Sequence, residues 1–144
     1  MRECRGCKRT LGTSEFASDT RTRCKGCELF TITLKNTRGR GAPLEMELDE
    51  VLEVFGASGS RRCFYCGIDE ASYVSLRIPT PGGIGLRLGL DRIDSAAPYV
   101  AGNVVICCLV CNRIKSSTFT HDEMLAIGRA INESWRARGL DAVL

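Results

Sequence analysis

Cysteine is the residue type in this chain with the clearest capacity for metal chemistry. Eight of the nine cysteines occur as four Cys-x-x-Cys pairs, and these pairs group into two sets of four. The sets are Cys4, Cys7, Cys24 and Cys27, followed by Cys63, Cys66, Cys108 and Cys111. Four thiolates carried on two short turns build the closed tetrahedral coordination of a structural zinc site. The sequence therefore predicts two structural Zn²⁺ ions.

Disulfide bonds are the alternative explanation of so many cysteines. Against them, the count is odd, and the first residues, beginning Met1-Arg2-Glu3, lack the apolar core of a signal peptide. The two-residue spacing also suits metal-binding turns better than structural bridges, so zinc is favoured. Cys107 is expected to be a buried strand cysteine. It is an alternative ligand to Cys108, but Cys108 keeps the two-residue spacing to Cys111.

Oxygen donors beside the second cysteine set suggest a further, catalytic metal. Asp91 stands at the end of an expected strand, and Asn112 opens an expected helix directly after Cys111. Hard cations such as Mg²⁺ or Mn²⁺ prefer carboxylate and amide oxygens of this kind. A metal held there can bind a phosphate oxygen and stabilise a leaving alkoxide, which is the chemistry of phosphodiester hydrolysis. The simpler interpretation of Asp91 is a carboxylate that stabilises a turn.

The segments around these residues resemble the HNH endonuclease superfamily, particularly its phage and bacterial members with a zinc-stapled ββα-metal core. The matching segments are Cys63-Phe64-Tyr65-Cys66-Gly67, Leu90-Asp91-Arg92-Ile93-Asp94, 98–105 and Cys108-Leu109-Val110-Cys111-Asn112-Arg113-Ile114-Lys115. Residues 1–28 further resemble the N-terminal Cys4 zinc ribbon of some members. The most specific part is the Asn-x4-Cys-x2-Cys-Asn-x2-Lys spacing that starts at Asn103.

This resemblance implies a metal-dependent endonuclease that hydrolyses DNA, with RNA as the other substrate left open. Asp91 and Asn112 match the ligands of a catalytic Mg²⁺ or Mn²⁺. Asn103 matches an asparagine that braces the loop and orients the general base.

Arg92 departs from the family pattern, in which the residue after the first metal-binding aspartate is usually a histidine that activates water. Arginine stays protonated at neutral pH and cannot act as a base. Asp94 or a metal-bound hydroxide could take that role, while Arg92 contacts phosphate or stabilises transition-state charge. The alternative function is a catalytically inactive HNH-like zinc protein that binds nucleic acid. A zinc-ribbon adaptor that binds another protein is the third and weaker hypothesis.

The charge distribution also favours a nucleic-acid partner. The net charge is only +3, but basic residues gather in and around both cysteine sets. Arg92, Arg113 and Lys115 are expected to contact phosphates, with ordinary solvated charge as the alternative for the last two. His121, the one histidine, is expected to be a solvated surface residue, with entry into the catalytic site as the alternative.

The elements that must position these residues define a small α+β protein. We expect a Cys4 zinc ribbon over residues 1–30, a basic linker and helix over 31–58, and an HNH-like ββα-metal domain over 59–144. Helices are predicted at 28–38, 45–55 and 111–116, with a last one that starts at the capping box Thr120–Glu123. Strands are predicted at 73–79, 84–90 and 103–108, the first two joined by a turn at 81–83.

The same sequence predicts a cytoplasmic protein that is a monomer or a weak dimer. No apolar run approaches the roughly 20 residues that a membrane-spanning helix requires.

Overall fold

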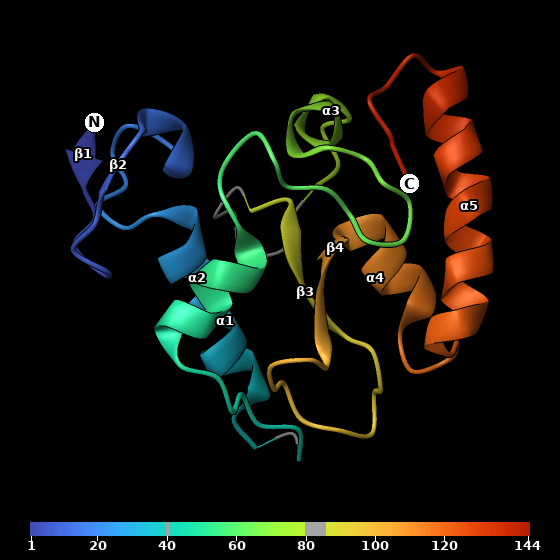
Figure 1. The fold of residues 1–144 in the computed structure, drawn as a ribbon, viewed down its shortest axis with the longest axis horizontal. Helices are drawn as coiled ribbons and strands as arrows, with labels where there is room; N and C mark the ends of the chain where they lie inside the picture. Colours follow the sequence, from blue (N-terminus) through green and yellow to red (C-terminus); the bar gives the residue numbers. More distant parts are fainter. Residues whose placement is uncertain (40, 80–85) are drawn as a thin grey trace.

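A computed structural model describes residues 1–39, 41–79 and 86–144. Its elements follow one another along the long axis of the molecule, from an N-terminal hairpin through a pair of helices and a two-stranded sheet to two more helices (Figure 1). This arrangement confirms the predicted α+β class. No helix among the described residues is long and apolar enough to cross a membrane.

The N-terminal ribbon is a small hairpin with its own apolar plug. Strand β1 (Arg2–Glu3) pairs antiparallel with β2 (Thr10–Leu11), and a short 3-10 helix, η1 (Thr13–Glu15), follows. Phe16 is buried against the first cysteine set, and the guanidinium carbon of Arg2 lies 4.0 Å from its ring centre. The ribbon thus has little core beyond this ring and its cysteines, which is typical of metal-stapled modules.

Two packed helices join the ribbon to the rest of the chain. Helix α1 (Lys25–Thr37) begins inside the second cysteine pair, three residues before its predicted start, and α2 (Leu48–Phe55) opens with a capping box between Glu47 and Glu50. A β-carbon added at Gly26 would lie 2.3 Å from a methyl group of Leu52. Glycine is therefore what allows α1 to approach α2 so closely at this point.

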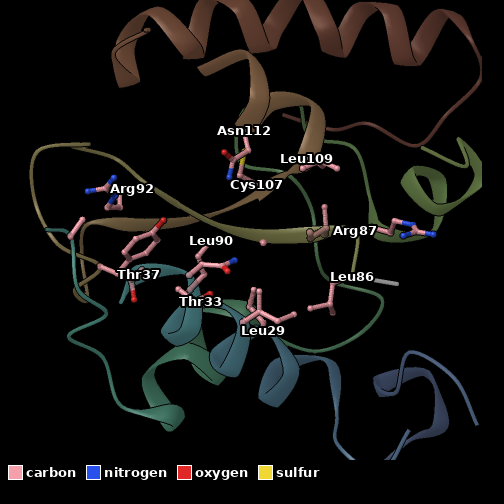
Figure 2. Close-up of a pocket in the computed structure, with 16 residues that line it drawn as sticks. Leu29, Thr33, Thr37, Leu86, Arg87, Leu90, Arg92, Cys107, Leu109 and Asn112 are labelled. Atoms are coloured by element: carbon pink, nitrogen blue, oxygen red, sulfur yellow. The ribbon is translucent and has the colours of Figure 1, made fainter. Parts of the chain in front are cut away.

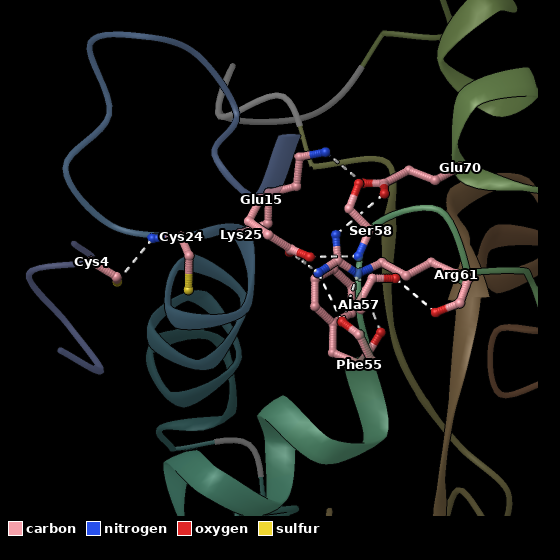
Figure 3. Close-up of polar contacts among 11 residues, drawn as sticks. Cys4, Glu15, Cys24, Lys25, Phe55, Ala57, Ser58, Arg61 and Glu70 are labelled. Atoms are coloured by element: carbon pink, nitrogen blue, oxygen red, sulfur yellow. Dashed lines mark hydrogen bonds and ion pairs between the residues drawn. The ribbon is translucent and has the colours of Figure 1, made fainter. Parts of the chain in front are cut away.

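A buried ion-pair network also ties the ribbon to the second module (Figure 3). Arg61 is only 3% exposed, and its guanidinium pairs with Glu15 of η1 and with Glu70. Lys25, at the start of α1, pairs with the same Glu70 at 2.9 Å. Glu15 of the ribbon thus pairs with Arg61 of the second module, and Lys25 at the start of α1 pairs with Glu70 of that module. These two ion pairs fix the orientation of the ribbon.

Residues 73–79, predicted as a strand, instead begin inside a helix. Helix α3 (Glu70–Ser75) starts at Asp69, whose side chain accepts a hydrogen bond from the backbone N–H of Ser72. The alternating apolar pattern was misleading because it covers only a few residues. In the structure Tyr73 is buried, whereas Val74, an apolar residue of that pattern, is exposed. The predicted turn at 81–83 and the first residues of the strand predicted at 84–90 lie outside the described residues.

The central sheet is an antiparallel pair. Strand β3 (Leu88–Arg92) pairs with β4 (Val104–Cys108), in a register that sets Asp91 opposite Val105. Helix α4 (Leu109–Lys115) follows β4 without a loop. Strand, loop, strand and helix are thus in the predicted order, and β3 runs two residues beyond its predicted end.

Helix α5 (His121–Ala137) covers the far side of α4 (Figure 1). Its capping box between Thr120 and Glu123 is present as predicted, and Met124 and Trp135 are buried in the main core. A β-carbon added at Gly128 would lie 2.1 Å from the carbonyl oxygen of Tyr65. This helix therefore packs directly on the turn that carries Cys63 and Cys66.

Candidate active site and zinc centres

The first cysteine set forms a compact sulfur cluster. The sulfur atoms of Cys4, Cys7, Cys24 and Cys27 all lie within 4.8 Å of one another. Burial acts to raise the pKa of Cys4, but hydrogen bonds from the backbone N–H groups of Cys24, Cys7 and Gly6 lower it to about 6. A β-carbon added at Gly6 would stand 2.7 Å from the sulfur of Cys27. Four converging thiols with backbone donors to sulfur fit a tetrahedral Zn²⁺.

The second cluster joins the parts of the ββα core. The sulfur atoms of Cys63, Cys66, Cys108 and Cys111 also lie within 4.8 Å of one another, and all four residues are buried. Two of these residues lie on the turn under α5, one ends β4 and one lies in α4. Cys107 is a buried strand cysteine outside the cluster, as the sequence predicts. A Zn²⁺ bound here would hold α4 against the strand that precedes it.

Asp91 is held by one of its two carboxylate oxygens. Oδ2 accepts a hydrogen bond from the Tyr65 hydroxyl at 3.0 Å and pairs with Lys115 Nζ at 3.1 Å. Burial first, and then the charge of Asp91, raises the pKa of Tyr65 well above its usual range, so its hydroxyl stays protonated and donates. Within the described parts of the chain Oδ1 accepts no hydrogen bond. The carboxylate is thus oriented, with one oxygen available to a ligand.

Lys115 occupies a different place from the one expected of it. Its side chain is fully buried, and its ammonium donates to the carbonyl oxygen of Arg92 at 2.7 Å besides pairing with Asp91. It is therefore neither a solvated surface charge nor placed to contact a phosphate, because its ammonium group is enclosed and binds Asp91 and Arg92 at the end of β3. Arg113, two residues earlier, is exposed as expected.

His121 lies beside Asp91 and not on the open surface that the sequence favoured for it. Its Nδ1 lies 3.1 Å from the Tyr65 hydroxyl, and its half-buried ring stacks on Phe64. The single Tyr65 proton is donated to Asp91, so Nδ1 is the donor in the contact with Tyr65, and Nε2 is the ring nitrogen that this contact does not use. No spacing in the sequence links positions 65, 91 and 121, and the only signal is that the chain has one histidine.

The loop between β3 and β4 is braced by the residues that the resemblance singled out. Asn103 accepts from the N–H of Asp94 and donates to the carbonyls of Asp94 and Pro98, at 2.9 to 3.1 Å. Arg92 Nη1 donates to two loop carbonyls, those of Ser95 and Ala97. Asp94 is exposed, and its Oδ1 accepts from the N–H of Ala96. The loop is thereby closed around the end of β3.

A cavity of about 540 Å³ opens between α1 and the sheet (Figure 2). Asn112 and Arg92 both line it, whereas Asp91 is not among its lining residues and faces Tyr65 and Lys115. Asn112 and Lys115 are one helical turn apart on α4, so both side chains are directed toward β3. Figure 2 shows Arg92 and Arg87 at opposite ends of the cavity.

The whole chain is similar to a solved restriction endonuclease. It matches the rare-cutting HNH restriction endonuclease PacI, whose structure is described in terms of a mechanism of DNA perturbation, with 37% sequence identity and a TM-score of 0.91. The match covers 97% of this chain and 99% of the PacI chain. No protein-family profile and no curated protein matches the chain.

This likeness extends over both cysteine clusters and the central ββα unit. The chain therefore belongs to the HNH endonuclease superfamily, in its zinc-stapled ββα-metal form. At the level of the family, its function is that of a DNA endonuclease.

Proposed function

We propose that this protein cleaves DNA phosphodiester bonds with the help of a divalent metal. The carrying observation is the state of Asp91: a nearly buried carboxylate with Oδ2 fixed by Tyr65 and Lys115 and with Oδ1 unpaired. Oδ1 is not enclosed by protein atoms, so this oxygen is open to solvent and to a ligand while Oδ2 holds the carboxylate in place. The full-length likeness to an HNH restriction endonuclease supports the same function.

In this proposal Asp91 Oδ1 and the side-chain oxygen of Asn112 hold Mg²⁺ or Mn²⁺. The bound ion would supply Lewis-acid stabilisation of the phosphate and the leaving oxygen. Tyr65 and Lys115 orient the carboxylate, and Asn103 keeps the adjoining loop closed. Arg92 presents positive charge at the cavity wall, where it stabilises the charge that develops on phosphate.

Two groups are proposed as acceptors for the proton of the attacking water. Asp94 is the exposed carboxylate on the loop, and Nε2 of His121 is the unused ring nitrogen connected to Asp91 through Tyr65. The substitutions Asp94→Asn and His121→Ala separate them, because only loss of the true acceptor should remove the lower limb of the pH–rate profile.

One observation favours the second candidate function, nucleic-acid binding without cleavage. Arg92 stands where the family usually has its histidine base, and its Nη1 is engaged by two loop carbonyls. A protein with this arrangement could bind DNA while lacking a base.

The deciding experiment is plasmid cleavage by the natively purified protein with and without Mg²⁺ or Mn²⁺. We expect metal-dependent cleavage that Asp91→Asn abolishes. Because this change removes the countercharge of Lys115, it should also lower stability, so cleavage is compared at a temperature at which zinc content and the circular dichroism spectrum show the variant to be folded. DNA binding by the wild type without any cleavage would establish the binding function instead. Cleavage that is indifferent to Asp91→Asn would place the chemistry elsewhere in the molecule.

A further inference from the structure

Helix α1 presents unpaired polar groups to the cavity beside the candidate site. Thr33 is only 9% exposed, yet among the described residues its hydroxyl has no hydrogen-bond partner, and it lines the cavity. Asn36, three residues later on the same face, also lines the cavity and its amide is likewise unpaired within the described chain. The Thr33 hydroxyl is open to the cavity and Asn36 is exposed at its edge, so both groups are available to donate and accept hydrogen bonds with a bound ligand.

The rest of the cavity wall defines the chemistry of that ligand. Leu29, Leu90 and Leu109 supply apolar surface, and Asn112 adds a second amide opposite α1. None of the described lining residues is acidic, and the two charged ones are arginines at the ends of the cavity. Apolar walls with neutral amide and hydroxyl groups suit the flat face and polar edge of a nucleobase. The arginines suit the phosphates on either side of it.

The volume is consistent with this occupant. About 540 Å³ lies within the range of roughly 300–1,000 Å³ that is usual for pockets holding small organic ligands. A site for phosphate alone would be expected to converge charged donors at its centre, whereas here the central groups on α1 are a hydroxyl and an amide.

We infer that this cavity receives a nucleobase of the bound DNA strand, and that Thr33 and Asn36 read its edge and set the sequence preference of the protein. The inference rests on the proposed DNA-directed function. It adds a recognition element outside the ββα unit: α1, which the ribbon zinc site anchors at its first turn.

The test compares sequence preference among three variants and the wild type. Thr33→Val removes the hydroxyl at almost constant volume, and Asn36→Ala removes an exposed amide whose loss does not threaten the fold. Thr31→Val is the matched control, because Thr31 is exposed on another face of α1 and its hydroxyl bonds back to its own helix. Each protein is incubated with a pool of random-sequence duplexes, and the bound and cleaved sequences are counted.

We expect Thr33→Val and Asn36→Ala to reduce discrimination at one or two base positions by about 5- to 100-fold, while Thr31→Val keeps the wild-type preference. Unchanged preference in both cavity variants, with DNA still bound or cut, would overturn the inference and leave the proposed function intact. Failure of the wild type to bind DNA would overturn both. Thr33-dependent binding of free mononucleotides, without a change in DNA preference, would show a nucleotide site instead.

Discussion

At the scale of single residues, the pairing of charges decides which side chains remain available for chemistry. Asp91 and Lys115 are both nearly or fully buried, and each needs the other because an uncompensated buried charge is strongly unfavourable. The pair still leaves Asp91 Oδ1 unbonded among the described residues. A buried lysine can thus orient a carboxylate and leave one of its oxygens available to a ligand.

Replacing the buried ammonium should therefore destabilise the protein strongly. We expect Lys115→Met to lower the free energy of unfolding by about 3–5 kcal/mol, since it leaves the Asp91 carboxylate without its countercharge. Chemical denaturation measures the change. Arg113→Met, an exposed position two residues away on α4, should change stability by less than about 0.5 kcal/mol.

A double variant separates the charge effect from lost packing. Adding Asp91→Asn to Lys115→Met should recover part of the lost stability, because a neutral amide needs no countercharge. If the double variant is as unstable as the sum of the two single changes, the ion pair is not the reason for the loss.

These residues also mark where sequence reasoning stops. Cysteine spacing was enough to identify both metal clusters, because two cysteines separated by two residues in a tight turn already place their sulfur atoms close enough to bind one metal ion. The burial of Lys115 and the link from His121 through Tyr65 to Asp91 were not foreseeable, since both depend on contacts between segments 23 to 56 residues apart. Only the folded chain brings those segments together.

At the scale of elements, periodicity predicted long helices well and the short one badly. The seventeen-residue helix α5 buries Met124 and Trp135 on one face and opens with a capping box, and these two signals agree with one another. The six-residue helix α3 offers too few positions to separate a period of 2 from one of 3.6. Its start signal was Asp69, a helix-capping aspartate that the alternating apolar residues masked.

Neighbouring arginines offer a test of the contacts between elements. Arg61 is buried between Glu15 and Glu70, whereas the side chain of Arg62 is 36% exposed and pairs with the exposed Asp141 (Figure 3 shows the Arg61 network). Arg61→Met should cost about 3–5 kcal/mol because it removes the cation that pairs with Glu15 and one of the two cations that pair with Glu70, while Arg62→Met should cost less than about 1 kcal/mol. Denaturant midpoints of the two variants give the comparison, and equal losses would mean that the Arg61 network does not join the modules.

At the scale of the whole molecule, the two metal clusters take the place of a large core. Chains of this size, divided between modules, bury too little apolar surface to be stable without such additions. The ribbon cluster anchors the first turn of α1, and the second cluster joins β4, α4 and the turn under α5. Helix α1 on one side of the cavity and β4 with α4 on the other are thus each attached to a metal cluster.

Zinc should accordingly be necessary for folding. We expect two Zn²⁺ per chain by elemental analysis of native protein, and loss of the second module's fold in Cys63→Ser, since metal binding supplies folding free energy. Cys107→Ser is the matched control, because Cys107 is buried beside the cluster without belonging to it, and this variant should retain both ions. One ion or none in the native protein would contradict the assignment of two structural sites.

The charge of the whole molecule predicts how it meets DNA. A net charge of +3 gives little long-range attraction to DNA, so affinity must come from a few local contacts. Each phosphate that the protein neutralises adds about 0.9 to the steepness with which log affinity falls against log salt concentration. Arg113→Gln should lower that slope by about one if α4 lies along the backbone, whereas Arg136→Gln, about 22 Å further along α5 than His121, should leave it unchanged. Fluorescence anisotropy at a series of salt concentrations measures both slopes. Equal slopes for the two variants would mean that the DNA backbone does not run past α4. In that case a scissile phosphate could not reach Asp91 and Asn112 as proposed.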